Sequence, residues 1–185
     1  RLIDVIARED KILKYLDIPL QHCNDKILKK MNRRGDKKYL CALLDKLRER
    51  IPGLVLRTSI IAGLPGEGEE EFDELCDFLR EQKLLLAGVF PYSPEEGTRA
   101  AKMERVDSDE AARRAERIVD IQSEIIDAWN DERQGDVMEV LCEGFDGQSM
   151  LFVGRSYAES PDIDGRIYFS APRDVAAGEF VPVRI

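Results

Sequence analysis

Apolar residues in positions 1–135 alternate between short continuous runs and stripes with helical spacing. The runs predict three strands, at about 15–20, 54–62 and 84–90. Between the first two, Leu40, Leu44 and Leu47 recur every three or four residues, which is typical of an amphipathic helix that Asp36 could cap. A last helix is predicted from Asp107 or Ser108 to about residue 134. Strands that alternate with helices predict an α/β fold with parallel strands.

The pattern changes at residue 136, where short strands and turns replace the helices. Strands are predicted near 137–143, 150–157, 166–170 and 180–185, and the dipeptide Asp146-Gly147 indicates a hairpin. Several short strands in so few residues predict a small all-β, OB-like barrel. We therefore expect two domains, 1–135 and 136–185. The second stops in mid-strand at Ile185, so we expect it to be incomplete at its C-terminus.

Only three strands are predicted in residues 1–135, and the outer two would be open edges, which soluble proteins rarely leave exposed. This favours the second half of a larger parallel barrel over a small three-layer domain. The chain also begins without Met, inside a predicted helix, which indicates a piece of a longer protein.

Composition narrows the class of protein. The net charge of −9 argues against a surface that wraps nucleic acid, because such surfaces are usually basic. No apolar run reaches the length of a membrane span. The four cysteines form no C-x-x-C pair and are typical of reduced, mostly buried thiols. A cytoplasmic protein is expected.

Residues 54–68 are the most informative stretch. An apolar strand ends in the loop Gly63–Gly68, and an acidic helix start follows at once. Glycine lets a ligand approach the backbone, and a helix N-terminus attracts anions, although an ordinary strand-to-helix turn explains the pattern equally well. The run Glu67–Glu74 fits a solvated helix start better than a metal site. His22, the only histidine, is predicted to have a structural hydrogen-bonding role.

Four segments, taken in order, resemble radical S-adenosylmethionine (SAM) methylthiotransferases, and most closely the RimO type, which modifies a ribosomal protein. They are YLDIPLQH at 15–22 with its continuation KILKKM at 26–31, LRTSIIAGLPGE at 56–67, GVFPYSPEEGT at 88–98 and GRSYAESPDIDGRIY at 154–168. The resemblance implies the second half of a radical SAM (partial TIM-like) barrel followed by most of a TRAM domain.

The same resemblance implies the chemistry. These enzymes use SAM and two 4Fe-4S clusters, one of them held by C-x-x-x-C-x-x-C early in the barrel. A 5′-deoxyadenosyl radical abstracts hydrogen from the β-carbon of an aspartate in ribosomal protein S-twelve, and a methylthio group is then added. The scattered cysteines here cannot form that motif, and an iron–sulfur cluster needs several thiolates that converge. No metal ligands or catalytic residues are therefore assigned, and this chain alone is expected to be inactive.

Carried over residue by residue, the resemblance predicts a SAM cradle at the carboxyl ends of the strands. Gln21 would face the ribose, and Arg33 or Arg34 would pair with the SAM carboxylate. A capping side chain and a solvated charge are the respective alternatives. Of Thr58 and Ser59, only one can point inward. The remaining predicted contacts are an adenine wall and two aromatic residues, which could instead fill the barrel: Ile61, Ala62, Gly63, Phe90 and Tyr92.

The charge of residues 136–185 indicates the target. This region has nine acidic residues, four arginines and no lysine, so its balance is −5. Such a surface repels RNA and attracts a basic ribosomal protein. Asp162 and Asp164 are predicted to bind that partner, although the turn sequence DIDG could require at least one of them for backbone geometry. A tRNA methylthiotransferase and a non-catalytic module that binds a basic protein remain as alternatives.

Overall fold

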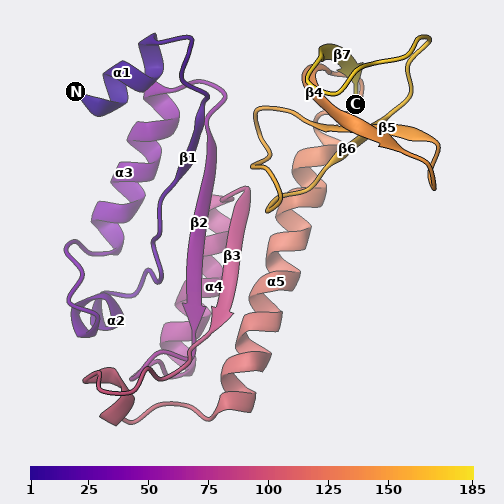
Figure 1. Cartoon of the computed structure of the whole chain (residues 1–185). Coiled ribbons are helices and arrows are strands. Elements are labelled where there is room, and N and C mark those ends of the chain that lie inside the picture. Colours follow the sequence, from indigo (N-terminus) through magenta and orange to yellow (C-terminus); the bar gives the residue numbers. More distant parts are fainter.

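The computed structural model describes all 185 residues and divides them into an α/β domain and a small β domain (Figure 1). The elements of the α/β domain are α1 (Leu2–Arg8), β1 (Tyr15–Asp17), α2 (Asp25–Lys30), α3 (Lys37–Arg50), β2 (Val55–Ala62), α4 (Glu69–Gln82), β3 (Leu86–Pro91), η1 (Ala100–Lys102) and α5 (Ser108–Asp131). Those of the β domain are β4 (Val137–Asp146), β5 (Leu151–Arg155), β6 (Ile167–Phe169) and β7 (Phe180–Arg184).

The first sheet is parallel, in the order β1-β2-β3, which confirms the three predicted strands. β1 is shorter than predicted because Pro19 has no N–H to donate to the neighbouring strand. Pairing resumes for one residue, Gln21, which bridges to Ile60 of β2. The chain therefore stays beside β2 up to the end of that strand.

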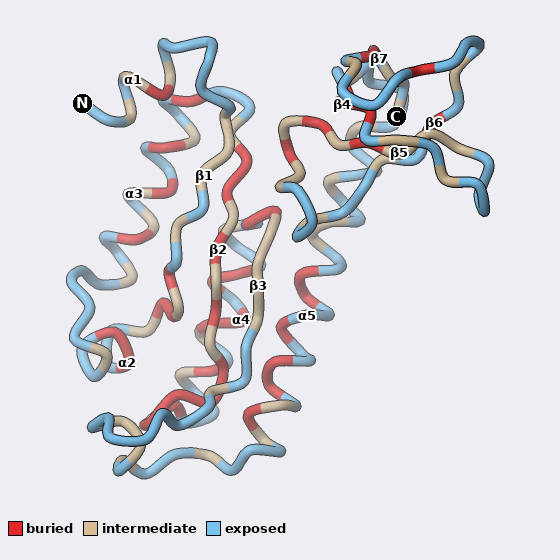
Figure 2. The backbone as a smooth tube through the Cα atoms, in the orientation of Figure 1, coloured by how far each residue is buried: buried red, intermediate tan, exposed pale blue.

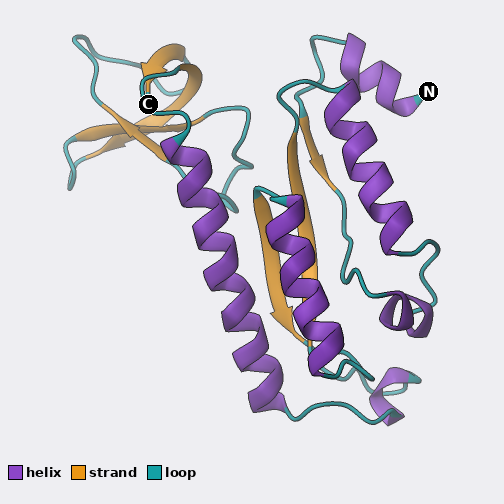
Figure 3. Cartoon of the chain, turned by 180° about the vertical axis from the view of Figure 1, so that it is seen from behind, coloured by secondary structure: helices purple, strands orange, loops and turns teal.

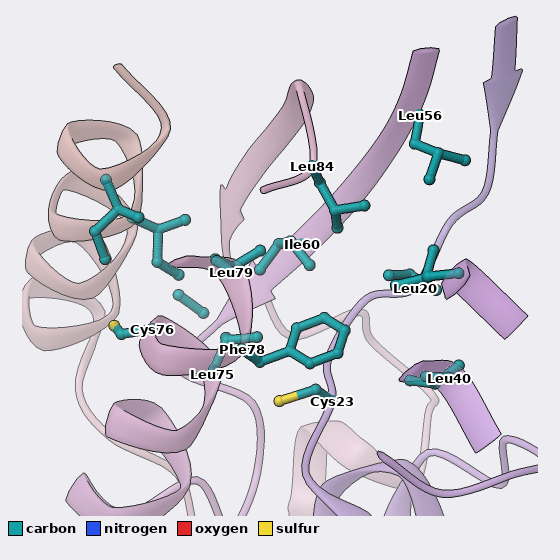
Figure 4. Packing of buried hydrophobic residues seen from close by; sticks show 14 of the residues in the cluster. Leu20, Cys23, Leu40, Leu56, Ile60, Leu75, Cys76, Phe78, Leu79 and Leu84 are labelled. Carbon is teal, nitrogen blue, oxygen red and sulfur yellow. The ribbon is translucent and has the colours of Figure 1, made fainter. Parts of the chain in front are cut away.

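The helices α3, α4 and α5 cover one face of this sheet (Figure 3). Alternate residues of β2 are buried against them, and Ile60 meets Phe78 and Leu79 of α4 in the core (Figure 4). The other residues of β2 belong to the opposite face, which no helix covers; the connection between β5 and β6 reaches it only at Val55 and Arg57. Figure 2 shows buried residues along β2 and in α3, α4 and α5. One open face is what the half-barrel prediction requires.

Side chains at the helix starts explain where the helices begin. Asp36 accepts a hydrogen bond from the Tyr39 amide (2.7 Å), and Asp107 accepts one from the Glu110 amide (2.8 Å), as expected for N-caps. The longest helix, α5, buries a stripe along one side, and Gly135 follows it at φ +93°. None of the helices has the length and apolar character that crossing a membrane would require.

The β domain is one antiparallel sheet in the order β6-β5-β4-β7, and its four strands confirm the predicted ones. The β4–β5 hairpin turns just after Asp146, as predicted. The sheet is curled, with β6 and β7 at its two edges (Figure 1). Its small core consists of Val140, Cys142, Phe169, Val175 and Val181.

The connection between β5 and β6 attaches the β domain to the amino ends of β1 and β2. The Tyr15 hydroxyl donates to Asp164 Oδ2 (2.9 Å), and Arg57 Nε lies 3.5 Å from Asp164 Oδ1. The Tyr157 hydroxyl donates to the carbonyl of Gly53 (3.0 Å). Burial and the bond to Asp164 raise the pKa of Tyr15 to about 12. The side chain of Asp164 is only 6% exposed, so it joins the two domains.

We expect Asp164→Asn to lower the free energy of unfolding by about 2 kcal/mol, since a buried hydrogen-bonded charge is lost opposite Arg57. Asp162→Asn is the matched control, because the Asp162 side chain is 91% exposed. A change within about 0.5 kcal/mol is expected there. Urea denaturation measures both, and equal effects would contradict the joining role of Asp164.

Candidate functional site

The carboxyl ends of all three parallel strands meet at one edge of the sheet. The Gln21 amide donates to the Ser59 carbonyl (2.8 Å), and the Ile61 amide donates to the Gln21 carbonyl (3.0 Å). On the other side of β2, the Tyr92 amide donates to the Ala62 carbonyl (2.8 Å). Gln21, Gly63 and Tyr92 therefore lie at the same edge, as predicted, and ligands of parallel α/β folds bind at this edge.

The structure distinguishes between the two candidate arginines. Arg33 reaches back from beyond α2 and donates to the carbonyl of Pro19, two residues before Gln21. Arg34 is exposed and makes no hydrogen bond or ion pair. Gln21 itself has φ +70°, an uncommon conformation for a residue other than glycine. Arg33 is therefore the arginine that is held at the edge beside Gln21.

The open face of the sheet carries an apolar pair next to this edge. Ile61 is in register with Phe90, and one step earlier Ser59 is in register with Gly88. Phe90 is 56% exposed, although it is a large apolar side chain. Because Gly88 has no side chain, the ring of Phe90 can lie against it, with Cε2 3.4 Å from the place that a Cβ would take. A flat apolar group such as a purine fits a surface of this kind.

Thr58 and Ala62 belong to the other face. The Thr58 hydroxyl donates to the Ile18 carbonyl (2.8 Å) and accepts from the Leu20 amide (3.2 Å), beneath the helix layer. The structure thus corrects the choice of Thr58: its hydroxyl holds the chain after β1 against β2, and its neighbour Ser59 is on the open face. Ala62 is also fully buried.

Tyr92 brings an unused polar group to the site. Its hydroxyl oxygen is buried and has no hydrogen-bond partner within the chain. Buried polar atoms are nearly always paired, so an unpaired hydroxyl at a ligand edge favours a bound polar group. The Tyr92 hydroxyl, the side-chain amide of Gln21 and the apolar pair Ile61–Phe90 together make an edge that suits the ribose and adenine of SAM.

Gly63 is required by both conformation and packing. It has φ +82°, and a Cβ at this position would lie 2.5 Å from the Cβ of Ala111 in α5. Its amide donates to Glu67 Oε1 (2.9 Å). The glycine therefore lets the loop after β2 pass directly against α5.

Glu67 is the centre of a buried polar network that joins three parts of the site. His22 Nε2 lies 3.2 Å from Glu67 Oε2, and Arg114 Nη1 donates to Glu67 Oε1 (2.8 Å). The side chains of His22 and Glu67 are fully buried, and that of Arg114 is 6% exposed. His22 follows β1, Glu67 ends the glycine loop and Arg114 belongs to α5, so the network holds these three segments together.

The surroundings of His22 determine its tautomer. The Asn24 amide donates to His22 Nδ1 (3.0 Å), so Nδ1 carries the lone pair. The proton of the neutral ring is then on Nε2, which faces Glu67. Burial alone would raise the pKa of Glu67, but hydrogen bonds from His22, Arg114 and the Gly63 amide outweigh it and hold the pKa below its usual value.

His22 was predicted to have a structural hydrogen-bonding role, and Glu67 is its partner. The prediction that Glu67 belongs to a solvated helix start was wrong. Glu69, Glu70 and Asp73 are exposed at the start of α4 as expected, but Glu67 is 3% exposed. One signal could have found this network. Arg114 is a charged residue on the stripe of α5 that otherwise contains Ala111, Ala115 and Ile118, and a buried arginine needs an acidic partner.

The cysteines do not converge on the site. All four are free thiols, and burial raises the pKa of Cys23 well above the usual range. Cys23 and Cys76 pack in the core of the α/β domain, while Cys142 packs in that of the β domain. No group of three or more His, Cys, Asp or Glu side chains is arranged to hold a metal ion. These residues do not form an iron–sulfur ligand set.

Comparison with known proteins finds a family match in each of the two domains. Residues 1–79 match the family described as the radical SAM superfamily, and residues 135–185 match the TRAM domain. Among solved structures, the chain is similar to coproporphyrinogen III oxidase (HemN) from Escherichia coli, described as a radical SAM enzyme. The TM-score is 0.54 at 21% identity, over 66% of this chain and 30% of that one, which supports the fold alone.

Curated relatives match the chain from end to end. It is 43% identical over 185 residues to the ribosomal protein uS12 methylthiotransferase RimO of Acetivibrio thermocellus, and 46% identical over 187 residues to that of Pelotomaculum thermopropionicum. All of this chain is covered, but only 41% and 42% of those two proteins. The chain thus spans about two fifths of their length.

Proposed function

We propose that this chain belongs to the radical SAM superfamily, carries a TRAM domain and works within an enzyme that methylthiolates the β-carbon of an aspartate in a small-subunit ribosomal protein. The observation that supports this best is the shared edge of the parallel sheet, where Gln21, Gly63 and Tyr92 come together beside an open face. The end-to-end similarity of this chain to uS12 methylthiotransferases supports the proposed reaction and target.

In this proposal the chain provides the cradle for SAM. When bound to a cluster, SAM supplies the 5′-deoxyadenosyl radical that abstracts hydrogen. The side-chain amide of Gln21 binds the ribose hydroxyls, and the Arg33 guanidinium pairs with the carboxylate. Ile61 and Phe90 border the adenine. The Tyr92 hydroxyl, which has no partner within the chain, is available to a polar atom of the cofactor. Ser59 replaces Thr58 in this set.

The clusters need ligands that this chain does not arrange. We infer that the two 4Fe-4S clusters of the proposed enzyme are bound by cysteines of another segment, and that the 185 residues alone do not catalyse the reaction. The dispersal of Cys23, Cys41, Cys76 and Cys142 through separate parts of the fold supports this division.

The charge of the β domain favours a basic protein as the target over RNA. Arg155 and Arg173 are each paired with a glutamate, at 2.8 Å for Arg155 Nε and Glu143 Oε1. Three acidic residues of this domain are exposed and take part in no ion pair: Asp136, Glu139 and Asp174. The unbalanced surface charge is therefore negative, and it attracts a basic protein while repelling phosphates.

The test of the function uses the complete enzyme, with the cluster-binding segment present, and mass spectrometry of the ribosomal protein. We expect a methylthio group on one aspartate. Gln21→Ala should raise the KM for SAM about tenfold, since hydrogen bonds to the ribose are lost. Asn32→Ala is the matched control, because Asn32 also has positive φ (57°, against 70° for Gln21) but its side chain is exposed and makes no hydrogen bond. Methylthiolation of a tRNA instead of the protein would reject the proposed target.

Asp162 provides a separate test of the docking surface. Asp162→Lys should slow association with the ribosomal protein several-fold, with an effect that shrinks at high salt, because exposed charges act mainly on encounter. Stopped-flow binding at two ionic strengths measures this. Asp164 is unsuitable for such a test, because reversing its charge would disturb the contact between domains. An association rate unaffected by Asp162→Lys would exclude this aspartate from the docking surface.

A further inference from the structure

A cavity lies at the amino ends of β2 and β3, at the end of the sheet opposite the proposed SAM edge. Its volume is about 210 Å³, well above the roughly 15 Å³ that one water molecule needs. Its walls come from the end of α3, the first residues of β2, the turn after α4, the end of α5 and Tyr157 of the β domain. The cavity therefore lies where the two domains meet.

All the charged side chains that line this cavity are positive. They are Arg48, Lys83 and Arg133, and no carboxylate is among the lining residues. None of the three takes part in an ion pair. The cavity thus gathers three cations that have no ion pair, in a chain whose net charge is −9.

Each cation keeps donors for a ligand. Arg48 donates to the side chain of Gln82 (3.1 Å) and to its carbonyl, which leaves three of its five N–H groups. Burial lowers the pKa of Arg48 and outweighs the opposing effect of the Asp45 charge, so the guanidinium is partly removed from water. The guanidinium of Arg133 is stacked 3.8 Å above the ring of Trp129, with its N–H edge free. Lys83 is exposed, and its side chain makes no hydrogen bond.

We propose that this cavity binds a small phosphate-type oxyanion. Two guanidinium groups and one ammonium group match an anion with three or more oxygens, and the absence of a lining carboxylate removes the usual competitor. A small anion fits better than an RNA backbone, because the adjoining β domain has a balance of −5. Since Tyr157 and Arg133 both line the cavity, the anion would stabilise the contact between the domains.

The chain contains its own reporter for this test. Trp129 is the only tryptophan and lines the cavity, so its fluorescence should respond to binding. We expect a saturable change when the 185-residue chain is titrated with inorganic phosphate at constant ionic strength, and none with chloride. Lys83→Gln should weaken binding about tenfold, because one charged hydrogen bond is lost. Lys38→Gln, on the exposed side of α3, should leave it unchanged.

A second arm identifies the source of the phosphate group. If ribose 5-phosphate binds at least tenfold more tightly than phosphate, the natural ligand is a phosphorylated metabolite, and equal affinities indicate free phosphate. A response that matches chloride, or that Lys83→Gln does not alter, would overturn the proposal. So would saturable binding of a short RNA in the absence of any response to phosphate.

Discussion

Replacing Glu67 by Gln should lower the free energy of unfolding by about 3 kcal/mol, the lower end of the range for breaking a buried ion pair. The three groups around this carboxylate, His22 Nε2, the Gly63 amide and Arg114 Nη1, are all donors. Glutamine has one acceptor and one donor, so its NH₂ group must face a donor in either orientation. Arg114 keeps ion pairs with Glu110 and Glu69, which limits the loss.

Glu69→Gln is the matched control, because it removes the same charge from the same region where the side chain is 67% exposed. Its effect should stay within about 0.5 kcal/mol. Urea denaturation at neutral pH compares the two variants. Equal and small losses would show that the carboxylate of Glu67 contributes little to the fold, despite its buried position.

The wild-type chain and the Glu67→Gln variant should respond differently to acid. The pKa of Glu67 in the folded chain lies below its ordinary value of 4.5. The stability that comes from its ionised form is therefore complete above about pH 4.5 and is lost as the pH falls through the lower, folded value. The difference in unfolding free energy between wild type and Glu67→Gln should accordingly shrink below pH 4.5.

The strands and the shared edge could be predicted from the sequence because they depend on local patterns. The apolar run of β2 and the glycine loop after it are continuous in sequence, and parallel connections place all strand ends together. The choice between Thr58 and Ser59 could not be predicted in this way. Alternation shows that they lie on opposite faces, but apolar residues occur on both faces of β2, and only the packed helices decide which face is buried.

The long-range polar contacts had no signal in the sequence around their acidic residues. Asp164 contacts Tyr15 across 149 residues of sequence, and Glu67 contacts Arg114 across 47. The acidic residues around each of them resemble an ordinary turn or helix start, so composition alone indicated solvated charge. Both contacts form where two separately predicted segments pack together, and that packing is a property of the complete fold.

Gly63→Ala should be more disruptive than any other glycine substitution at the edge, with a loss of about 2–4 kcal/mol. Alanine at positive φ costs about 1 kcal/mol by itself, and overpacking adds about 1–3 kcal/mol. Gly97→Ala separates the two effects, because Gly97 has the same φ of +82° and nothing within 4 Å of its would-be Cβ. Only the first contribution should appear there.

Ala111→Gly completes the test, because it removes the methyl group that a Cβ at Gly63 would meet at 2.5 Å. Alone, it should destabilise α5 by about 1 kcal/mol, the usual cost of glycine in a helix. Combined with Gly63→Ala, it should recover at least 1 kcal/mol, which a double-mutant cycle measures as coupling between the two sites. Strictly additive losses would mean that the loop after β2 tolerates a side chain without moving α5. If coupling is found, the KM for SAM in the complete enzyme should rise in Gly63→Ala and recover in the double variant, because the close approach of loop and helix sets the position of the Gly63 and Glu67 backbone at the cofactor edge.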